Sequence, residues 1–131
     1  MSTLALSAFF AAYIESALAR SVIEDERDEK HGYSLDVKYG PEDISPTLLS
    51  AMRADCAAFL LANGPEIGEK YENAGRDFWI ARNDCGAGFW DESGEWSDYE
   101  AKRLISSSKA AGPIHLYIGE DEMIYAKSPM C

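Results

Sequence analysis

The chain has 131 residues, of which 47% are hydrophobic and 11% aromatic. That is enough for one folded domain, which we expect to span residues 1–131 with a frayed C-terminus, and it argues against disorder. Twelve Lys and Arg residues stand against 23 Asp and Glu, which gives a formal charge of −11. We therefore expect no direct binding to nucleic acid, because affinity for a phosphate backbone comes mainly from Lys and Arg.

The cysteines and histidines predict no disulfide framework and no zinc site. Cys56, Cys85 and Cys131 are odd in number and widely spaced, and there is no C-x-x-C motif. The only histidines, His31 and His115, are far apart in the sequence. We expect a protein of a reducing cytoplasm with no metal and no cofactor.

The first half of the chain predicts two helices. Apolar residues at three- and four-residue steps indicate a helix over Thr3–Ile23, which is too interrupted by charge for a signal peptide and too short in its apolar run for a membrane span. After the charged run 24–30, the segment Tyr33–Tyr39 is expected to be a short irregular strand. Ser45 and Pro46 then predict the start of a helix that ends near Ala62, with a short helical turn after it.

The second half changes to a period of two. Asp77–Asn83 alternates as a strand, a turn follows, and Ala87–Asp91 returns as its partner. Ser97, with Glu100 three positions later, predicts a capped helix to about Ala110. The segments 114–118 and 123–126 form a second predicted hairpin, with Leu116 facing inward.

These elements predict an α+β fold in the order α-α-ββ-α-ββ. We expect an antiparallel sheet of about four strands, made of two hairpins and covered on one face by three or four helices.

The segment 74–91 carries a family resemblance. Its sequence, Ala-Gly-Arg-Asp-Phe-Trp-Ile-Ala-Arg-Asn followed after two residues by Gly-Ala-Gly-Phe-Trp-Asp, resembles the D-F-W-x-x-R-N-x-x-G-A-G-F-W-D pattern of small uncharacterised bacteriophage and prophage proteins. Leu116–Asp121 resembles the terminal hairpin of the same family, whereas the N-terminal half matches it more loosely. The resemblance implies an accessory protein that works inside a bacterial host cell, and it brings no catalytic residues with it.

The aromatic hairpin offers one candidate binding surface. This surface would contain Trp79, Arg82, Asn83 and Trp90. Trp and Arg are among the residue types that dominate interface hot spots, and Asn83 is the neighbour of Arg82 in the chain. The structural alternative is that they form a core nucleus. The hot-spot hypothesis predicts that Trp79 or Trp90 is substantially exposed.

Two chemical alternatives are weaker. Cys85 in a glycine-flanked turn could pair with His115 as a nucleophile and base, although the neighbouring Asp84 would oppose thiolate formation. The acids 91–100 could bind a divalent cation, but Gly94 does not stand where a calcium loop requires it. We therefore predict no enzyme activity.

The acidic residues offer the other candidate surface. Segments 24–30, 91–100 and 120–122 carry −3, −5 and −3, which together equal the net charge of the chain. If the last two segments converge, they form one partner-binding face. Its members are Asp91, Glu92, Glu95, Asp98, Glu100, Glu120, Asp121 and Glu122. The alternative is that the charge only confers solubility.

The functional prediction combines the charge with the phage resemblance. We expect a non-enzymatic, acidic protein in the cytoplasm of the bacterial host cell. It would imitate a nucleic-acid backbone and inhibit a host restriction, CRISPR or other nucleic-acid-binding protein through that protein's basic surface.

Overall fold

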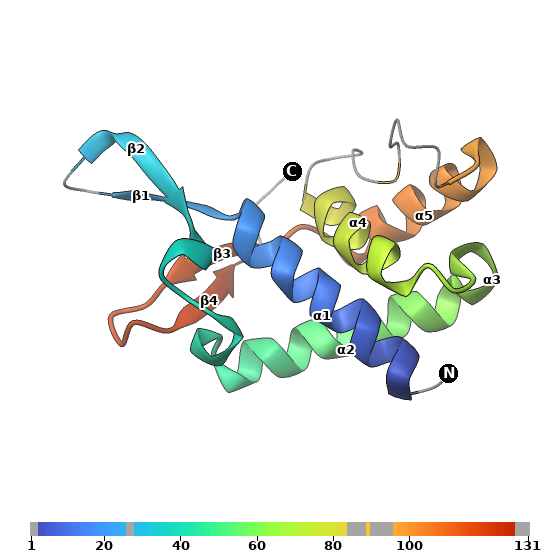
Figure 1. Cartoon of the computed structure of the whole chain (residues 1–131), viewed down its shortest axis with the longest axis horizontal. Coiled ribbons are helices and arrows are strands. Elements are labelled where there is room, and N and C mark those ends of the chain that lie inside the picture. Colours follow the sequence, from blue (N-terminus) through green and yellow to red (C-terminus); the bar gives the residue numbers. More distant parts are fainter. Residues whose placement is uncertain (1–2, 26–27, 84–88, 90–95, 128–131) are drawn as a thin grey trace.

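The structure is a computed structural model that describes residues 3–25, 28–83, 89 and 96–127, with the backbone alone for the described part of 23–32. Figure 1 shows its helices crossing one another at one end and its hairpins at the other. The helices are α1 (Thr3–Arg20), α2 (Pro46–Ala62), α3 (Gly64–Ile67), α4 (Tyr71–Asn83) and α5 (Asp98–Ala111). The strands are β1 (Val22–Asp25), β2 (Asp28–Ser34), β3 (His115–Ile118) and β4 (Ile124–Lys127), with two short 3-10 helices, η1 (Leu35–Val37) and η2 (Pro41–Asp43).

The core lies mainly between helices α1 and α4. One stripe of α1, including Phe9, Tyr13 and Ala17, is fully buried, and α4 packs along it. Phe78 of α4 stacks on Phe59 of α2 with ring centroids 4.1 Å apart. The interleaved aromatic rings join three helices into one apolar cluster.

Gly75 lets the two helices approach this closely. A Cβ atom at Gly75 would collide with the backbone carbonyl of Phe9 and would lie 3.2 Å from the amide nitrogen of Tyr13. The backbones of α1 and α4 are therefore in contact at this crossing, where a side chain does not fit.

The predicted strand over Asp77–Asn83 is wrong, because these residues form the second half of helix α4. Ala74, Phe78 and Arg82 are buried at four-residue spacing, which is the period of a helix face. Helix α4 buries Trp79 as well as Phe78, so its buried face is wide. The sequence of such a wide face resembles the alternating pattern of a strand. The predicted partner strand over Ala87–Asp91 lies outside the described residues except for Phe89.

The predicted four-stranded sheet is also wrong. The described residues form a mostly helical fold with two separate two-stranded antiparallel sheets, β1–β2 and β3–β4. The first hairpin comes from the charged run and the residues after it, with Ile23 opposite Tyr33, while 35–37 forms η1 and no strand. The sequence pattern missed this hairpin because charged residues are depleted in strands.

Several other predicted elements are confirmed. Helix α2 begins at Pro46, with the Ser45 side chain accepting a hydrogen bond from the amide of Leu48. Helix α5 is capped by Ser97, and the last hairpin pairs Leu116 with Ala126. A parallel bridge between Ile44 and Ile124 attaches this hairpin to the residues just before α2.

Among the described helices, none combines the length and apolar character needed to cross a lipid bilayer.

Candidate functional site

Trp79 does not form an exposed hot spot. Its side chain is 4% exposed and meets the ring of Tyr13 edge to face, with the centroids 5.4 Å apart. Trp90 lies outside the described residues. The hot-spot hairpin is therefore wrong for the part that the structure describes, because helix α4 directs Trp79 into the core.

Arg82 and Asn83 also hold the fold together from within. Arg82 is 3% exposed and donates hydrogen bonds to the hydroxyl of Tyr13 and to Oδ2 of Asp55, both at 3.0 Å. Its guanidinium also reaches the carbonyls of Ala111 and Gly112 at the end of α5. Asn83 accepts a hydrogen bond from the amide of Ile114. These contacts form a buried network, so the guanidinium group of Arg82 is not available to a binding partner.

The groups beside Arg82 are not poised for chemistry. Burial raises the pKa of the Tyr13 hydroxyl and of the Cys56 thiol, so both stay protonated near neutral pH. Cys85 lies outside the described residues, and His115 is an exposed residue of β3. Among the described residues, no three His, Cys, Asp or Glu side chains gather in a way that could hold a metal ion.

The predicted acidic face is divided between two ends of the molecule. Asp98 and Glu100 lie in the first turn of α5, whereas Glu120–Glu122 lie in the turn between β3 and β4, at the opposite end in Figure 1. Asp91, Glu92 and Glu95 lie outside the described residues. The described members of this set therefore do not form one contiguous surface, because the whole length of α5 separates them.

Glu100 has a local structural role. Its carboxylate accepts a hydrogen bond from the amide of Ser97 at 2.9 Å, and the hydroxyl of Ser97 accepts one from the amide of Glu100. The bond from the Ser97 amide lowers the pKa of Glu100. This capping box satisfies amides at the start of α5, and it accounts for one acid without any partner.

The turn after β3 is a built structure. The carboxylate of Asp121 accepts hydrogen bonds from the hydroxyl of Tyr125 and from the amide of Met123, and these bonds, with that of Tyr125 the stronger, lower its pKa. Glu122 follows with a φ of 64°, an unusual conformation for a residue with a side chain. Its carboxylate accepts a hydrogen bond of 2.8 Å from the hydroxyl of Tyr39.

The hydrogen bond from Tyr39 connects the turn to the 3-10 helices. It raises the pKa of Tyr39 to about 12, because the neighbouring carboxylate favours the protonated phenol. Lys38 also approaches Glu122, at 4.0 Å. The turn 119–123 is thus held against the segment that carries η1 and η2.

The acids of these segments gather at one end of the molecule. Both 3-10 helices and the turn after β3 lie together, away from the start of α5 (Figure 1). We call residues 33–43 and 119–123 the acidic end. It contains six acids and one base, a net charge of −5 out of the −11 of the chain. Sequence reasoning missed Asp36, Glu42 and Asp43, because they are not in a long charged run and only the fold brings the segment that carries them against the turn of Glu122.

An apolar groove of about 560 Å³ borders the acidic end. We call it the apolar groove. It lies between α1, the 3-10 segment and the first part of α2. Its lining residues are Phe10, Ala11, Ile14, Glu15, Leu18, Asp36, Tyr39, Gly40, Pro41 and Leu49. The walls are apolar or aromatic except at Glu15 and Asp36, so the groove suits an apolar group that carries positive charge at its edge.

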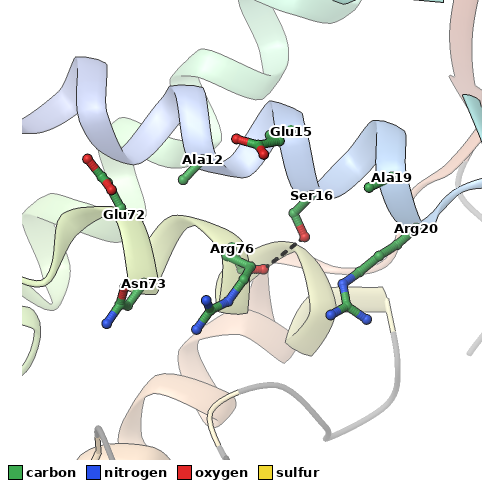
Figure 2. A pocket seen from close by; sticks show the side chains of 8 residues that line it. All are labelled: Ala12, Glu15, Ser16, Ala19, Arg20, Glu72, Asn73 and Arg76. Atoms are coloured by element: carbon green, nitrogen blue, oxygen red, sulfur yellow. Dashed lines mark hydrogen bonds between the residues drawn. The ribbon is translucent and has the colours of Figure 1, made fainter. Parts of the chain in front are cut away.

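A second pocket, of about 340 Å³, lies between α1 and α4. Figure 2 shows the guanidinium groups of Arg20 and Arg76 on one side of it and the carboxylates of Glu15 and Glu72 on the other. Ser16 is engaged, because its hydroxyl donates a hydrogen bond to the carbonyl of Arg76, and Arg76 itself pairs with Asp77. The charges are of both signs, so this pocket selects no class of ligand.

The comparisons with protein-family models, with curated proteins and with solved structures gave no match. The resemblance to phage and prophage proteins therefore stays a prediction.

Proposed function

We propose that this protein is a non-enzymatic binding protein whose acidic end occupies the basic surface of a nucleic-acid-binding protein. In the setting that the phage resemblance suggests, the partner is a restriction, CRISPR or other nucleic-acid-handling protein in the cytoplasm of a bacterial host cell. The acidic end replaces the divided set around residues 91–100 and 120–122 as the contact surface.

The observation that supports this proposal is the concentration of charge. A net −5 over the 16 residues of the acidic end gives this part of the molecule a strong field of one sign. Proteins that bind DNA or RNA carry Lys and Arg to neutralise phosphates, so an anionic protein surface can compete for the same groups. Such a field speeds association with a basic partner and weakens as salt increases.

The acids available for contact can be separated from those that hold the fold. Asp36, Glu42 and Glu120 are exposed, and the hydrogen bond from the hydroxyl of Ser34 to Asp36, at 2.6 Å, is a local surface contact that the amide oxygen of Asn can also accept. By contrast, the carboxylate of Asp43 accepts a hydrogen bond from the amide of Gly40, and Asp121 is bonded within its turn. The first three can therefore be neutralised with little structural effect.

The test is displacement of labelled duplex DNA from purified bacterial restriction and CRISPR nucleases, followed by fluorescence anisotropy. We expect the wild-type protein to displace DNA from at least one of them at low salt. The triple variant Asp36→Asn, Glu42→Gln and Glu120→Gln should need about tenfold more protein for the same displacement.

The matched control changes the same charge elsewhere. Glu69, Glu72 and Asp98 are exposed and lie outside the acidic end. Their neutralisation to Gln, Gln and Asn should leave the displacement curve unchanged. Equal weakening by both triple variants, or displacement that is insensitive to salt, would contradict a specific acidic contact surface.

A further inference from the structure

The apolar groove and the acidic end share residues, and this overlap is informative about the partner. Asp36 and Tyr39 line the groove, and Tyr39 also donates its hydroxyl to Glu122 of the acidic turn. A group that enters the groove therefore lies beside the carboxylates that would hold a basic surface. We propose that the apolar groove binds a large apolar side chain presented by a basic peptide segment of the partner. This inference rests on the proposed function and adds the specificity element to it.

The size and lining of the groove fit such a side chain. Its volume of about 560 Å³ falls within the range of roughly 300–1,000 Å³ typical of ligand pockets. Phe10 and Leu49 are partly exposed lining residues, and the buried side chains of Ile14 and Leu18 also line the groove. A leucine or an aromatic ring on the partner would cover this surface and remove it from water.

Charge complementarity identifies the segment around that side chain as basic. Glu15 and Asp36 stand in the groove wall, and Glu42 and Asp43 belong to the adjoining η2. The described basic groups nearby are already engaged: Lys38 approaches Glu122, and the guanidinium of Arg53 lies over the ring of Phe10 with its carbon 5.6 Å from the centroid. A neutral or acidic segment would leave the negative charge of these carboxylates unneutralised, whereas Lys or Arg flanking the apolar side chain would neutralise it.

One exposed apolar residue directly follows Asp36 of the groove wall. Val37 of η1, next to Asp36, exposes 73% of its surface. It is an apolar side chain that a segment passing Asp36 can contact.

Two helix positions allow a clean test of the groove. Ala11 lines the apolar groove and Ala19 lines the pocket between α1 and α4, and both are exposed residues of the same helix. Ala11→Phe fills the groove, and Ala19→Phe adds the same side chain outside it. The probes are three dye-labelled peptides: one rich in Lys with a central pair of Leu, one with those Leu changed to Ala, and one with the Lys changed to Glu.

Binding is measured by fluorescence anisotropy on the full chain. We expect the Lys/Leu peptide to bind about tenfold more tightly than the Lys/Ala peptide, because it adds burial of large apolar side chains. Ala11→Phe should abolish this difference, Ala19→Phe should retain it, and the Glu/Leu peptide should not bind. Thermal unfolding checks that Ala11→Phe is folded, and chemical-shift changes at the Ala11 and Leu49 methyls in the wild-type protein give a readout that needs no variant.

The possible failures are distinguishable. If the Lys/Leu and Lys/Ala peptides bind equally and both respond to the acidic-end variant, the groove is not used and the acidic end remains supported. If the Glu/Leu peptide binds as well as the Lys/Leu peptide, the groove takes an apolar group without charge selection, which overturns this inference. If no peptide binds, the inference is wrong and DNA displacement alone decides the proposed function. Self-association in analytical ultracentrifugation that Ala11→Phe abolishes would identify a second copy of the chain as the occupant and would likewise overturn it.

Discussion

At the scale of single residues, Arg82 shows how a side chain expected at a binding surface serves the core. From α4 it reaches Tyr13 of α1, Asp55 of α2 and the carbonyls that end α5. A cation at the C-terminus of a helix is favoured by the partial negative charge of its unpaired carbonyls. Arg82 therefore connects all four long helices through one planar group.

Replacing Arg82 tests this role. Arg82→Leu should lower the free energy of unfolding by about 3 kcal/mol, since the hydroxyl of Tyr13 and two carbonyls lose a buried donor. Urea denaturation measures the change. Arg53→Leu is the matched control, because Arg53 is exposed on α2 and its loss should cost about 0.5 kcal/mol. Equal losses in the two variants would contradict the network.

At the scale of elements, the crossing of α1 and α4 depends on Gly75. An alanine is intrinsically the better helix former by about 1 kcal/mol, so helix propensity alone predicts that Gly75→Ala stabilises the protein. The backbone contact with Phe9 predicts the opposite sign.

We expect Gly75→Ala to destabilise the fold by about 2 kcal/mol, because the helices must separate or shift to admit a methyl group. Gly64→Ala is its control. A Cβ at Gly64 meets nothing within 4 Å, so that change should be neutral or slightly stabilising in the same thermal or urea unfolding measurement. A stabilising Gly75→Ala would show that the crossing tolerates a side chain.

The same helix explains where sequence reasoning succeeded and where it failed. Helices α2 and α5 carried their own start signals, Ser45 with Pro46 and Ser97 with Glu100, and local chemistry was enough to place them. Helix α4 carried aromatic residues and a mid-helix glycine, which locally favour a strand or a turn, and only packing against α1 makes that sequence helical. Local patterns predict elements that are locally stabilised.

The candidate site followed the same rule. The acids 120–122 could be recognised as a charged turn, but their neighbours could not, because Glu122 meets Tyr39 across 83 positions of sequence. A count of charge along the chain groups acids that are adjacent in sequence. It assigned Asp98 and Glu100 to the same surface as Glu120, and the fold places them at opposite ends.

At the scale of the whole molecule, the hydrogen bond between Tyr39 and Glu122 joins the two parts of the acidic end. The pKa of Tyr39 is raised from 10.0 to about 12, so the folded state holds this proton more tightly than the unfolded chain does. The stabilisation from this bond is therefore complete below pH 10 and is lost as the pH rises through about 12.

Tyr39→Phe should consequently destabilise the protein by about 0.5–1 kcal/mol at neutral pH. Urea unfolding at several pH values should show this difference shrinking between pH 10 and 12, because the phenol ionises in the unfolded chain while it stays protonated in the folded protein. Tyr99→Phe, at a residue that is 66% exposed on α5, should show no such difference. A gap between wild type and Tyr39→Phe that is constant through alkaline pH would contradict the bond.

The bridge between Ile44 and Ile124 has a consequence for the order of folding. Helices α1, α2 and α4 are complete once residue 83 has been synthesised, so their aromatic cluster can assemble early on a ribosome-bound chain. The C-terminal hairpin must then close a very long loop to reach the start of α2, and closing long loops is slow. The helical body can therefore form before the acidic end is complete, because Ile124 must first reach Ile44 at the start of α2.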